Sequence, residues 1–407
     1  MSEASAAEAA TAGRITDEGI AKMRERIGVV VPRDAPFNTE ASIDGIRHFT
    51  AAYGDENPLY SDPEYAASTR WEGLIAAPPF VLTMGESEVK TIRPELRARG
   101  AHALAGVHEF FTGDDMQFFK PIRPGDRLTK RYYLCAVNEK AESRMSGGRA
   151  VHTHYRSDYI NQQGELVAIE RFNFMRMERE GARESGKQAK ISPAVYTDEQ
   201  LAEIDAAYAA QPPPRGSDPR YWEDVTVGDD VGTMVKGPLT TTDVIVWMRG
   251  WGGGVQSNRR AWKHRQRAPK FFTKNANNAW DVVQRVHWDD TMARAVGNPA
   301  AFDYGRMRSS HLTHLVTNWM GDDAWLWRLA CQHRQFNFVG DVQWVRGTVV
   351  AKSVEPEGHV ADLEVSCTNQ RGERVSLGNA RVILPSRAAG PVALPAPDGE
   401  DDVPLLY

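Results

Sequence analysis

Residues 161–168 read NQQGELVA, and residues 369–376 read NQRGERVS. Each octapeptide follows a run in which apolar and polar residues alternate, which is typical of a β-strand with one buried face. Asn with Gly three positions later favours a tight hairpin turn, because both residues tolerate positive φ. The two stretches therefore predict two copies of a strand–turn–strand unit.

Two further pairs of matches lie upstream of these turns, in the same order in both halves. They are KPIRPGDRL (120–128) with FNFVGDVQW (336–344), and Tyr60, Asp62 and Ala66 with His287, Asp289 and Ala293. Chance could supply one such match, but hardly three in the same order. We therefore interpret the chain as a duplicated unit.

Each half shows the same order of elements. A helical pattern comes first, then a loop and a second short helical pattern, then three or four strands separated by Gly-Asp and Asn-x-x-Gly turns. The helical patterns cover 42–54 and 63–69 in the first half, and 240–252 and 290–296 in the second. This order predicts an α+β fold in which antiparallel strands pack against a helix.

The composition outside the repeats marks the boundaries of the two units. The expected segments are a mobile tail at 1–20, a domain at 21–176, a linker at 177–220, a second domain at 221–386 and a tail at 387–407. The linker carries one helical pattern, TDEQLAEIDAAYAAQ (197–211), which begins with a Thr–Asp cap.

The overall composition is that of an ordinary globular protein. The 407 residues carry a net charge of −5, with 25% charged residues, so no nucleic-acid or membrane partner is expected. The three cysteines, Cys135, Cys331 and Cys367, are far apart and have no zinc-site spacing, which fits a reducing compartment. Without a signal-peptide pattern or a long apolar run, we expect a cytoplasmic location.

Several motifs resemble those of the MaoC-like acyl dehydratases, a family that includes (R)-specific enoyl-CoA hydratases. They are GDENPLYSDPEYA (54–66) with GLIAAPPF (73–80) in the first half, and VHWDDTMARAVGNPAAFDYG (286–305) with FVGDVQWVRGTVVAK (338–352) in the second. The resemblance covers roughly 37–175 and 221–386. It implies a double hotdog, in which each unit wraps a curved antiparallel sheet around a central helix.

The resemblance also implies a reaction. The family adds water across the double bond of a 2-enoyl thioester or removes it, and it uses no metal or organic cofactor. A histidine can exchange protons at neutral pH, a carboxylate can orient the water, and a backbone N–H at a helix start can stabilise the developing negative charge on the thioester oxygen.

The first half carries an incomplete family motif. Asp55, Asn57 and Pro58 match it, but Tyr60 stands where the family has its histidine. Tyrosine, with a pKa of about 10, is a poor base at neutral pH. We therefore predict that this half is not catalytic and that Asp55, Asn57 and Tyr60 contact the substrate.

The second half supplies the predicted base, His287, and the predicted oxyanion donor, the amide of Gly305. Tyr304 stands where the family has a second histidine and is predicted to contact substrate. The family's acid position is occupied by Val282, so two aspartates remain as candidates: Asp303, on the segment that lines the site in the family, and Asp281, one position out of register.

Other polar residues of the second half have simpler interpretations. Asp289 and Asp290 fit the start of a helix, where they would stabilise its dipole. His311 and His314 lie three apart on a helical pattern, but no third ligand has suitable spacing, so we expect packing or surface placement rather than a metal site.

An inserted segment before His287 is strongly basic. Its cations are Arg259, Arg260, Lys263, Arg265, Arg267, Lys270 and Lys274. Such a run can be a solvated face, or it can bind the phosphates of coenzyme A. The substrate-binding prediction rests on Arg259, Arg260 and Arg265.

The sequence thus predicts a hydro-lyase that interconverts a 2-enoyl-CoA and a 3-hydroxyacyl-CoA. Its partner would be an acyl-CoA or an acyl-carrier thioester, and a homodimer is compatible with the resemblance. Two alternatives remain open: a non-catalytic thioester-binding protein or subunit, and a hotdog thioesterase.

Overall fold

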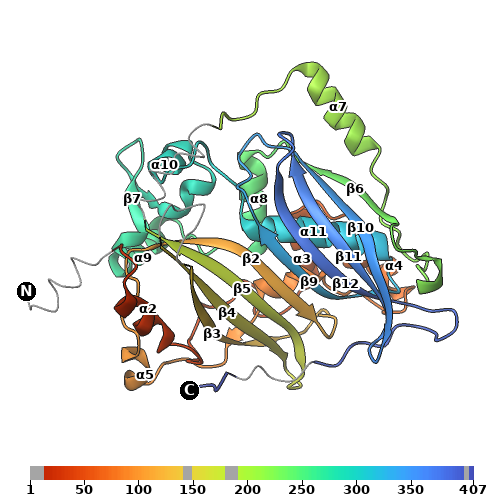
Figure 1. The fold of residues 1–407 in the computed structure, drawn as a ribbon, viewed down its shortest axis with the longest axis horizontal. Helices are drawn as coiled ribbons and strands as arrows, with labels where there is room; N and C mark the ends of the chain where they lie inside the picture. The colour runs from red at the N-terminus through yellow and green to blue at the C-terminus, as the bar shows by residue number, and fades with distance from the viewer. Residues whose placement is uncertain (1–12, 141–148, 179–190, 398–402) are drawn as a thin grey trace, which may run out of the picture.

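The computed structural model describes residues 13–140, 149–178, 191–397 and 403–407. Within them, one ten-stranded sheet runs through the molecule in the order β1-β3-β4-β5-β2-β9-β12-β11-β10-β6 (Figure 1). Its strands are β1 (Glu86–Ser87), β2 (His108–Phe118), β3 (Leu128–Lys140), β4 (Ala150–Asn161), β5 (Leu166–Met177), β6 (Asp230–Lys236), β9 (Trp325–His333), β10 (Gln343–Glu355), β11 (Gly358–Asn369) and β12 (Arg374–Leu384).

The two sequence halves meet inside this sheet. Strand β2 of the first half pairs antiparallel with β9 of the second, from Gly113 opposite Gln332 to Gln117 opposite Arg328. The side chains of Asp115 and Arg328 form an ion pair at 2.5 Å across this junction. The halves are therefore joined by backbone hydrogen bonds as well as by packing.

Both predicted hairpin turns are confirmed. Asn161 turns β4 into β5 and Asn369 turns β11 into β12, and each asparagine side chain accepts a hydrogen bond from the backbone N–H four residues on. Gly164 and Gly372 adopt φ values of 81° and 75°, which explains why glycine stands there in both copies.

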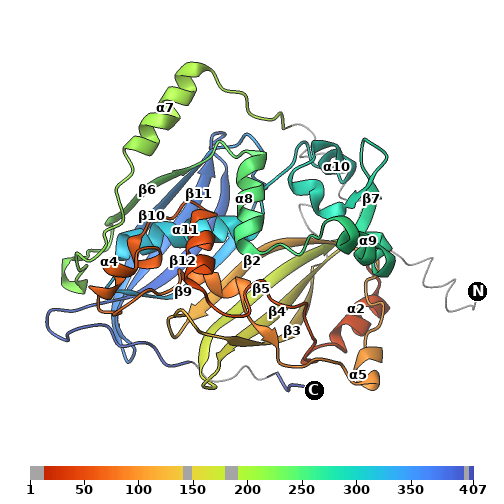
Figure 2. The same cartoon turned by 180° about the vertical axis from the view of Figure 1, so that it is seen from behind.

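One long helix, α11 (Gly305–Met320), occupies the middle of the second half. It lies against the sheet, as Figure 2 shows, and all of its residues except Gly305, Arg306 and Asn318 are buried. Its counterpart in the first half is the short 3-10 helix η2 (Pro78–Thr83), which packs against α11. Two prolines at its start remove backbone donors, so this segment does not form an α-helix as long as α11.

The remaining helices fall partly on predicted helical patterns, at 43–51, 63–67, 198–209, 241–251 and 290–295, and partly where none was predicted. They are α2 (Asp17–Arg24), α3 (Ile43–Ala51), η1 (Pro58–Tyr60), α4 (Pro63–Ala67), α5 (Pro94–Ala98), α7 (Asp198–Ala209), η3 (Trp222–Asp224), α8 (Thr241–Trp251), α9 (Asn258–Arg267), η4 (Pro269–Phe271), η5 (Val283–His287) and α10 (Asp290–Ala295). Asp289 caps α10, as expected. Helix α8 crosses α3, and the predicted linker helix α7 begins with a Thr197 capping box.

The predicted tails are partly ordered. Residues 1–12 lie outside the described residues, but α2 starts at Asp17 and buries Ile20 and Met23 against Leu104, so the prediction of a mobile tail over 1–20 is wrong from there on. At the other end, Leu406 pairs with Val29 in an isolated bridge. Apolar side chains hold both segments, although their composition favoured disorder.

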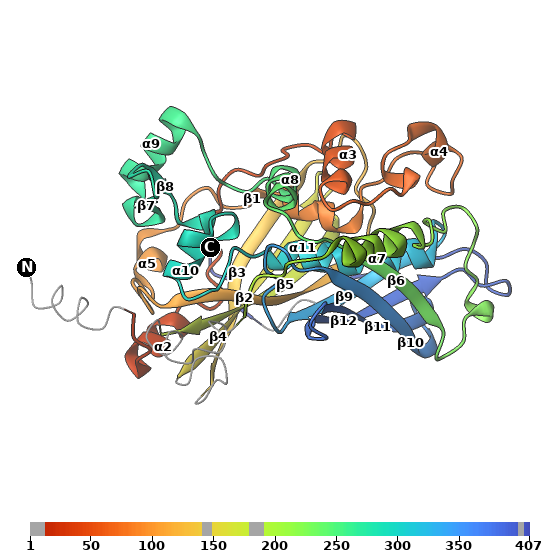
Figure 3. The ribbon, with the colours of Figure 1, turned by 90° about the horizontal axis from the view of Figure 1, so that it is seen from above.

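The basic insertion forms a separate lobe at one end of the molecule (Figure 3). It contains α9, η4, α10 and a two-stranded sheet of β7 (Phe272–Lys274) and β8 (Trp280–Val282). No helix among the described residues is long and apolar enough to cross a membrane.

Candidate functional site

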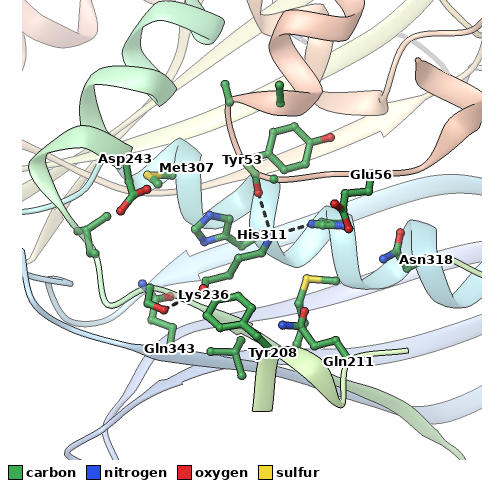
Figure 4. Close-up of a pocket in the computed structure, with 18 of the residues that line it drawn as sticks. Tyr53, Glu56, Tyr208, Gln211, Lys236, Asp243, Met307, His311, Asn318 and Gln343 are labelled. Atoms are coloured by element: carbon green, nitrogen blue, oxygen red, sulfur yellow. Dashed lines mark hydrogen bonds between the residues drawn. The ribbon is translucent and has the colours of Figure 1, made fainter. Parts of the chain in front are cut away.

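A cavity of about 570 Å³ lies along α11, between the loop after α3, the start of α8, strand β6 and the end of the linker (Figure 4). The linker contributes Pro212, Pro213 and Pro214 to its wall. Because the wall includes Tyr53 and Gly54 from the first half and Lys236 from the second, the cavity exists only where the two halves meet.

Helix α11 presents a polar stripe to this cavity. Met307, His311, His314 and Asn318 all line it and are spaced four, three and four residues apart, which places them on one face of the helix. The helix is buried on its other faces, so these polar side chains need partners inside the protein.

Three ionisable side chains form a chain of contacts that starts at the cavity wall with Lys236 and His314 and ends behind it at Asp55. The ammonium of Lys236 donates to the backbone oxygen of Tyr53 and to Nδ1 of His314, both at 2.8 Å. On the other edge of the ring, Nε2 of His314 lies 3.6 Å from Oδ1 of Asp55. Since an ammonium can only donate, Nδ1 of His314 accepts and the ring hydrogen sits on Nε2, directed at Asp55. We call Lys236, His314 and Asp55 the relay.

The loop after α3 holds Asp55 in place. The hydroxyl of Tyr53 donates to Oδ2 at 2.9 Å, and the backbone N–H of Asn57 donates to Oδ1 at 3.0 Å. The side chain of Asn57 in turn caps η1 by accepting from the N–H of Leu59. The family motif Asp-x-Asn-Pro thus explains how this carboxylate is oriented.

Burial changes the ionisation of the relay. It raises the pKa of Asp55, against the hydrogen bonds from Asn57 and Tyr53 and the attraction of Lys236. It lowers the pKa of Lys236, against the attraction of Asp55. Burial and the charge of Lys236 also hold the pKa of His314 well below its usual value, so the imidazole is neutral. These opposite shifts favour proton exchange near neutral pH.

His311 lies one helical turn before His314. Its Nδ1 is buried and has no hydrogen-bond partner among the described residues. The same is true of Oδ1 of Asn337 and Oε1 of Gln343, and both of these residues also line the cavity. Buried polar atoms without partners are uncommon in proteins. Their gathering in one cavity indicates a place for a polar ligand or water.

Sequence reasoning missed His311, His314 and Lys236. The two histidines had been interpreted as packing or surface residues; the structure buries both, and it also places them at the cavity wall. The available signal was the spacing of 307, 311, 314 and 318 in an otherwise apolar helix. Nothing in the sequence indicated that Asp55, from the other half, lies beside His314.

The predicted base, His287, lies at the N-terminal end of α11. Its Nδ1 donates to the backbone oxygen of Phe302 at 2.8 Å, and its ring stacks on Tyr304 with 3.8 Å between centroids. Because the carbonyl can only accept, Nε2 is left as an acceptor. Burial lowers the pKa of His287 to about 4. The hydroxyl of Tyr304 accepts from Gln284 at 2.8 Å.

Among the described residues, the carboxylate of neither predicted acid is hydrogen-bonded to His287, although the backbone of Asp303 is. Asp303 is buried and ion-paired with Arg308 at 3.1 Å, and burial raises its pKa to about 7. Asp281 lies on β8, where its carboxylate accepts from the N–H of Val282 and from Asn275. The predicted role of either aspartate as the acid that orients the water therefore stays a prediction.

The other predicted residues are spread over the molecule. Gly305 begins α11 beside Phe111, where an added Cβ would lie 2.4 Å from the ring. Tyr60 is buried near Asp55. Burial raises the pKa of the Tyr60 hydroxyl above its usual value, and the negative charge of Asp55 raises it further. On the insertion, Arg265 lies over the ring of Trp280, at 4.7 Å from its centroid. No metal-binding group of three or more residues exists among those described.

Comparisons with known proteins concern part of the sequence and the overall fold. Residues 27–170 match the family model described as FAS1-like, dehydratase domain region. A UPF0336 protein of Streptomyces avermitilis is 32% identical over 145 residues, which cover 35% of this chain and 91% of that protein. A probable enoyl-CoA hydratase alpha subunit of Thermomonospora curvata is 27% identical over 165 residues, and the match spans 38% of this chain but only 51% of that relative.

Solved structures share the whole fold. A protein described as a MaoC-like dehydratase matches 88% of this chain and 98% of its own, with a TM-score of 0.59 and 16% identity. A Mycobacterium tuberculosis protein described as having a double hotdog fold matches 88% of this chain and 96% of its own, with a TM-score of 0.52 and 11% identity. The predicted α+β double hotdog is confirmed.

Proposed function

The chain belongs to the MaoC-like dehydratase family, and we propose that it hydrates or dehydrates an acyl thioester in the cavity along α11. One observation carries this proposal: Lys236 and His314 line a cavity of about 570 Å³ and contact one another, and Asp55 lies behind them against His314. Cavities of this size accommodate small-molecule ligands. The relay supplies the proton-exchanging groups that the reaction needs.

Hydration requires one proton to leave the attacking water and one to reach C2. In the proposal, the relay takes up the water proton as the C3–O bond forms, with the ionised Asp55 carboxylate as its acceptor, and then returns a proton to C2 as the enolate collapses. The relay ends the cycle with its original charge. Dehydration is the reverse, in which the relay takes the C2 proton and delivers one to the departing hydroxyl.

Two further interactions would assist, one from Lys236 of the relay and one from His311. The Lys236 ammonium has three N–H bonds, of which two are used by Tyr53 and His314. The third can point at the thioester oxygen, where negative charge develops. Nδ1 of His311, which has no hydrogen-bond partner among the described residues, is suited to holding the water.

A second location for the proton transfer is the N-terminal end of α11. The hydrogen bond from His287 to Phe302 leaves Nε2 of the ring as an acceptor, and the first N–H groups of α11, beginning at Gly305, have no partner within the helix. Asp303 or Asp281 would be the acid in that scheme. It is the weaker proposal, because no carboxylate pairs with His287 among the described residues, whereas His314 faces Asp55 at 3.6 Å.

The function is tested with the purified chain and crotonyl-CoA, by following loss of the enoyl thioester. Turnover by the chain alone supports the enzyme. The name of the Thermomonospora relative, an alpha subunit, favours one alternative: a thioester-binding subunit that needs a partner. Binding of the thioester without turnover would support that alternative, and release of free thiol would instead indicate a thioesterase.

The basic lobe is proposed to hold the phosphates of coenzyme A through Arg259, Arg260 and Arg265. Replacing all three with Gln should raise KM for crotonyl-CoA by about tenfold and leave kcat unchanged, because the contacts would be the same in ground and transition states. Crotonyl-pantetheine, which lacks the nucleotide, is the matched substrate. An equal rise of KM for both substrates would contradict this role.

A further inference from the structure

A second cavity, of about 520 Å³, lies on the first half of the sheet. Strands β3, β4 and β5 form one wall, and the segment around α2 and the loop 103–107 form the other. It shares no lining residue with the cavity along α11. Neither the predicted site residues nor the relay are part of it.

Aromatic rings line its sheet side. Tyr132, Tyr155 and Phe172 stand on three adjacent strands with centroids 5.5–6.0 Å apart and interplanar angles of 3° to 17°. Phe174 meets Tyr155 and Phe172 edge-on. Nearly parallel rings of this kind offer flat apolar surfaces, which suit another flat apolar group better than a flexible chain.

Two guanidinium groups stand on the opposite wall. Arg26 and Arg33 line the cavity and are solvent-exposed, and neither forms an ion pair with any residue that the structure describes. The guanidinium of Arg33 lies over Tyr132, at 4.7 Å from the ring centroid. The third arginine of the cavity, Arg176, is already paired with Glu109 at 2.5 Å. The cavity therefore combines an aromatic wall with two cations that are free to meet an anion.

We propose that this second cavity binds a flat aromatic carboxylate, with its rings against Tyr132, Tyr155 and Phe172 and its carboxylate toward Arg33 and Arg26. Guanidinium groups match carboxylates in geometry as well as in charge. This binding is separate from the hydro-lyase proposal and does not depend on it.

The test is calorimetric titration of the full chain with 2-naphthoate and with 2-naphthamide, which has the same rings without the charge. The wild type should bind the carboxylate at least about tenfold more tightly than the amide. Arg33→Gln should remove most of this preference, whereas Arg33→Lys should keep part of it. Arg33 is exposed, so neither change threatens the fold.

The aromatic wall is tested with a matched pair at Tyr155. Tyr155→Ala should weaken naphthoate binding by about tenfold, while Tyr155→Phe, which keeps the ring, should bind like the wild type. Lys236→Met shows which cavity the ligand occupies, because Lys236 lines only the cavity along α11. This variant should bind naphthoate like the wild type. The proposal is wrong if naphthoate does not bind at millimolar concentration, if Arg33→Gln leaves the preference unchanged, or if only Lys236→Met abolishes binding.

Discussion

At the scale of single residues, the arrangement of Asp55 determines what the cavity can do. Its place in a family motif was visible in the sequence, together with Asn57, which donates to it. Its partner His314 was not visible. The two residues are 259 positions apart in different halves, and they belong neither to one motif nor to equivalent positions of the repeat. Motifs report local geometry well, whereas a contact across a domain junction leaves no local pattern.

The relay predicts a bell-shaped dependence of kcat/KM on pH. Activity requires ionised Asp55 and protonated Lys236. It should rise with pH through the pKa of Asp55, which burial places above the usual carboxylate range, and fall through the pKa of Lys236, which burial places below the usual lysine range.

Asp55→Asn isolates the acidic limb of that profile. The amide can still accept from Asn57, so the loop should keep its shape, but the variant cannot ionise. The acidic limb should disappear and the rate should fall by about 10²-fold. Asp44→Asn, an exposed change on α3, is the control. A profile with an unchanged acidic limb in Asp55→Asn would contradict the assignment.

At the scale of elements, the sequence predicted short-range structure well. Both Asn-x-x-Gly hairpins, the caps of α7 and α10 and the position of α8 follow from local chemistry. The path of the basic insertion and the ordering of α2 could not be predicted from local sequence. The ordering of α2, for example, depends on packing against a distant residue, Leu104. The polar residues on one face of α11 were visible in the sequence, but their role was ambiguous. The structure shows that they line a cavity.

The crossing of α3 and α8 gives a prediction for stability. Gly250 of α8 packs so closely that an added Cβ would lie 2.3 Å from Cβ of Ala52 and 3.1 Å from the oxygen of His48. Gly250→Ala should therefore destabilise the protein by about 1–3 kcal/mol, because one of the two helices must shift. The measurement is the urea midpoint of unfolding.

Gly254 provides the matched control for this element. It follows the same helix, but an added Cβ would meet nothing within 4 Å. Gly254→Ala should change the free energy of unfolding by less than about 0.5 kcal/mol. Equal effects of the two substitutions would show that the close helix crossing is not maintained in solution.

At the scale of the whole molecule, the two halves depend on one another. They share a continuous sheet through β2 and β9, and the relay takes Asp55 from the first half and Lys236 and His314 from the second. In the proposed mechanism, one site forms at the junction of the two halves, so neither half would need a complete family motif.

This dependence predicts a single unfolding transition in urea. All tryptophans except Trp71 lie in the second half, so tryptophan fluorescence reports mainly on that half, whereas circular dichroism reports on both. If the junction couples the halves, the two signals should share one midpoint. Two separated midpoints would mean that the halves unfold independently.

The most direct test of the relay compares His314→Gln with His287→Gln in the hydration of crotonyl-CoA. The proposed relay predicts a loss of about 10²–10⁴-fold in kcat for His314→Gln and less than about tenfold for His287→Gln, with both variants folded by circular dichroism. The reverse order, with His287 essential and His314 dispensable, would contradict the relay and move the chemistry to the start of α11.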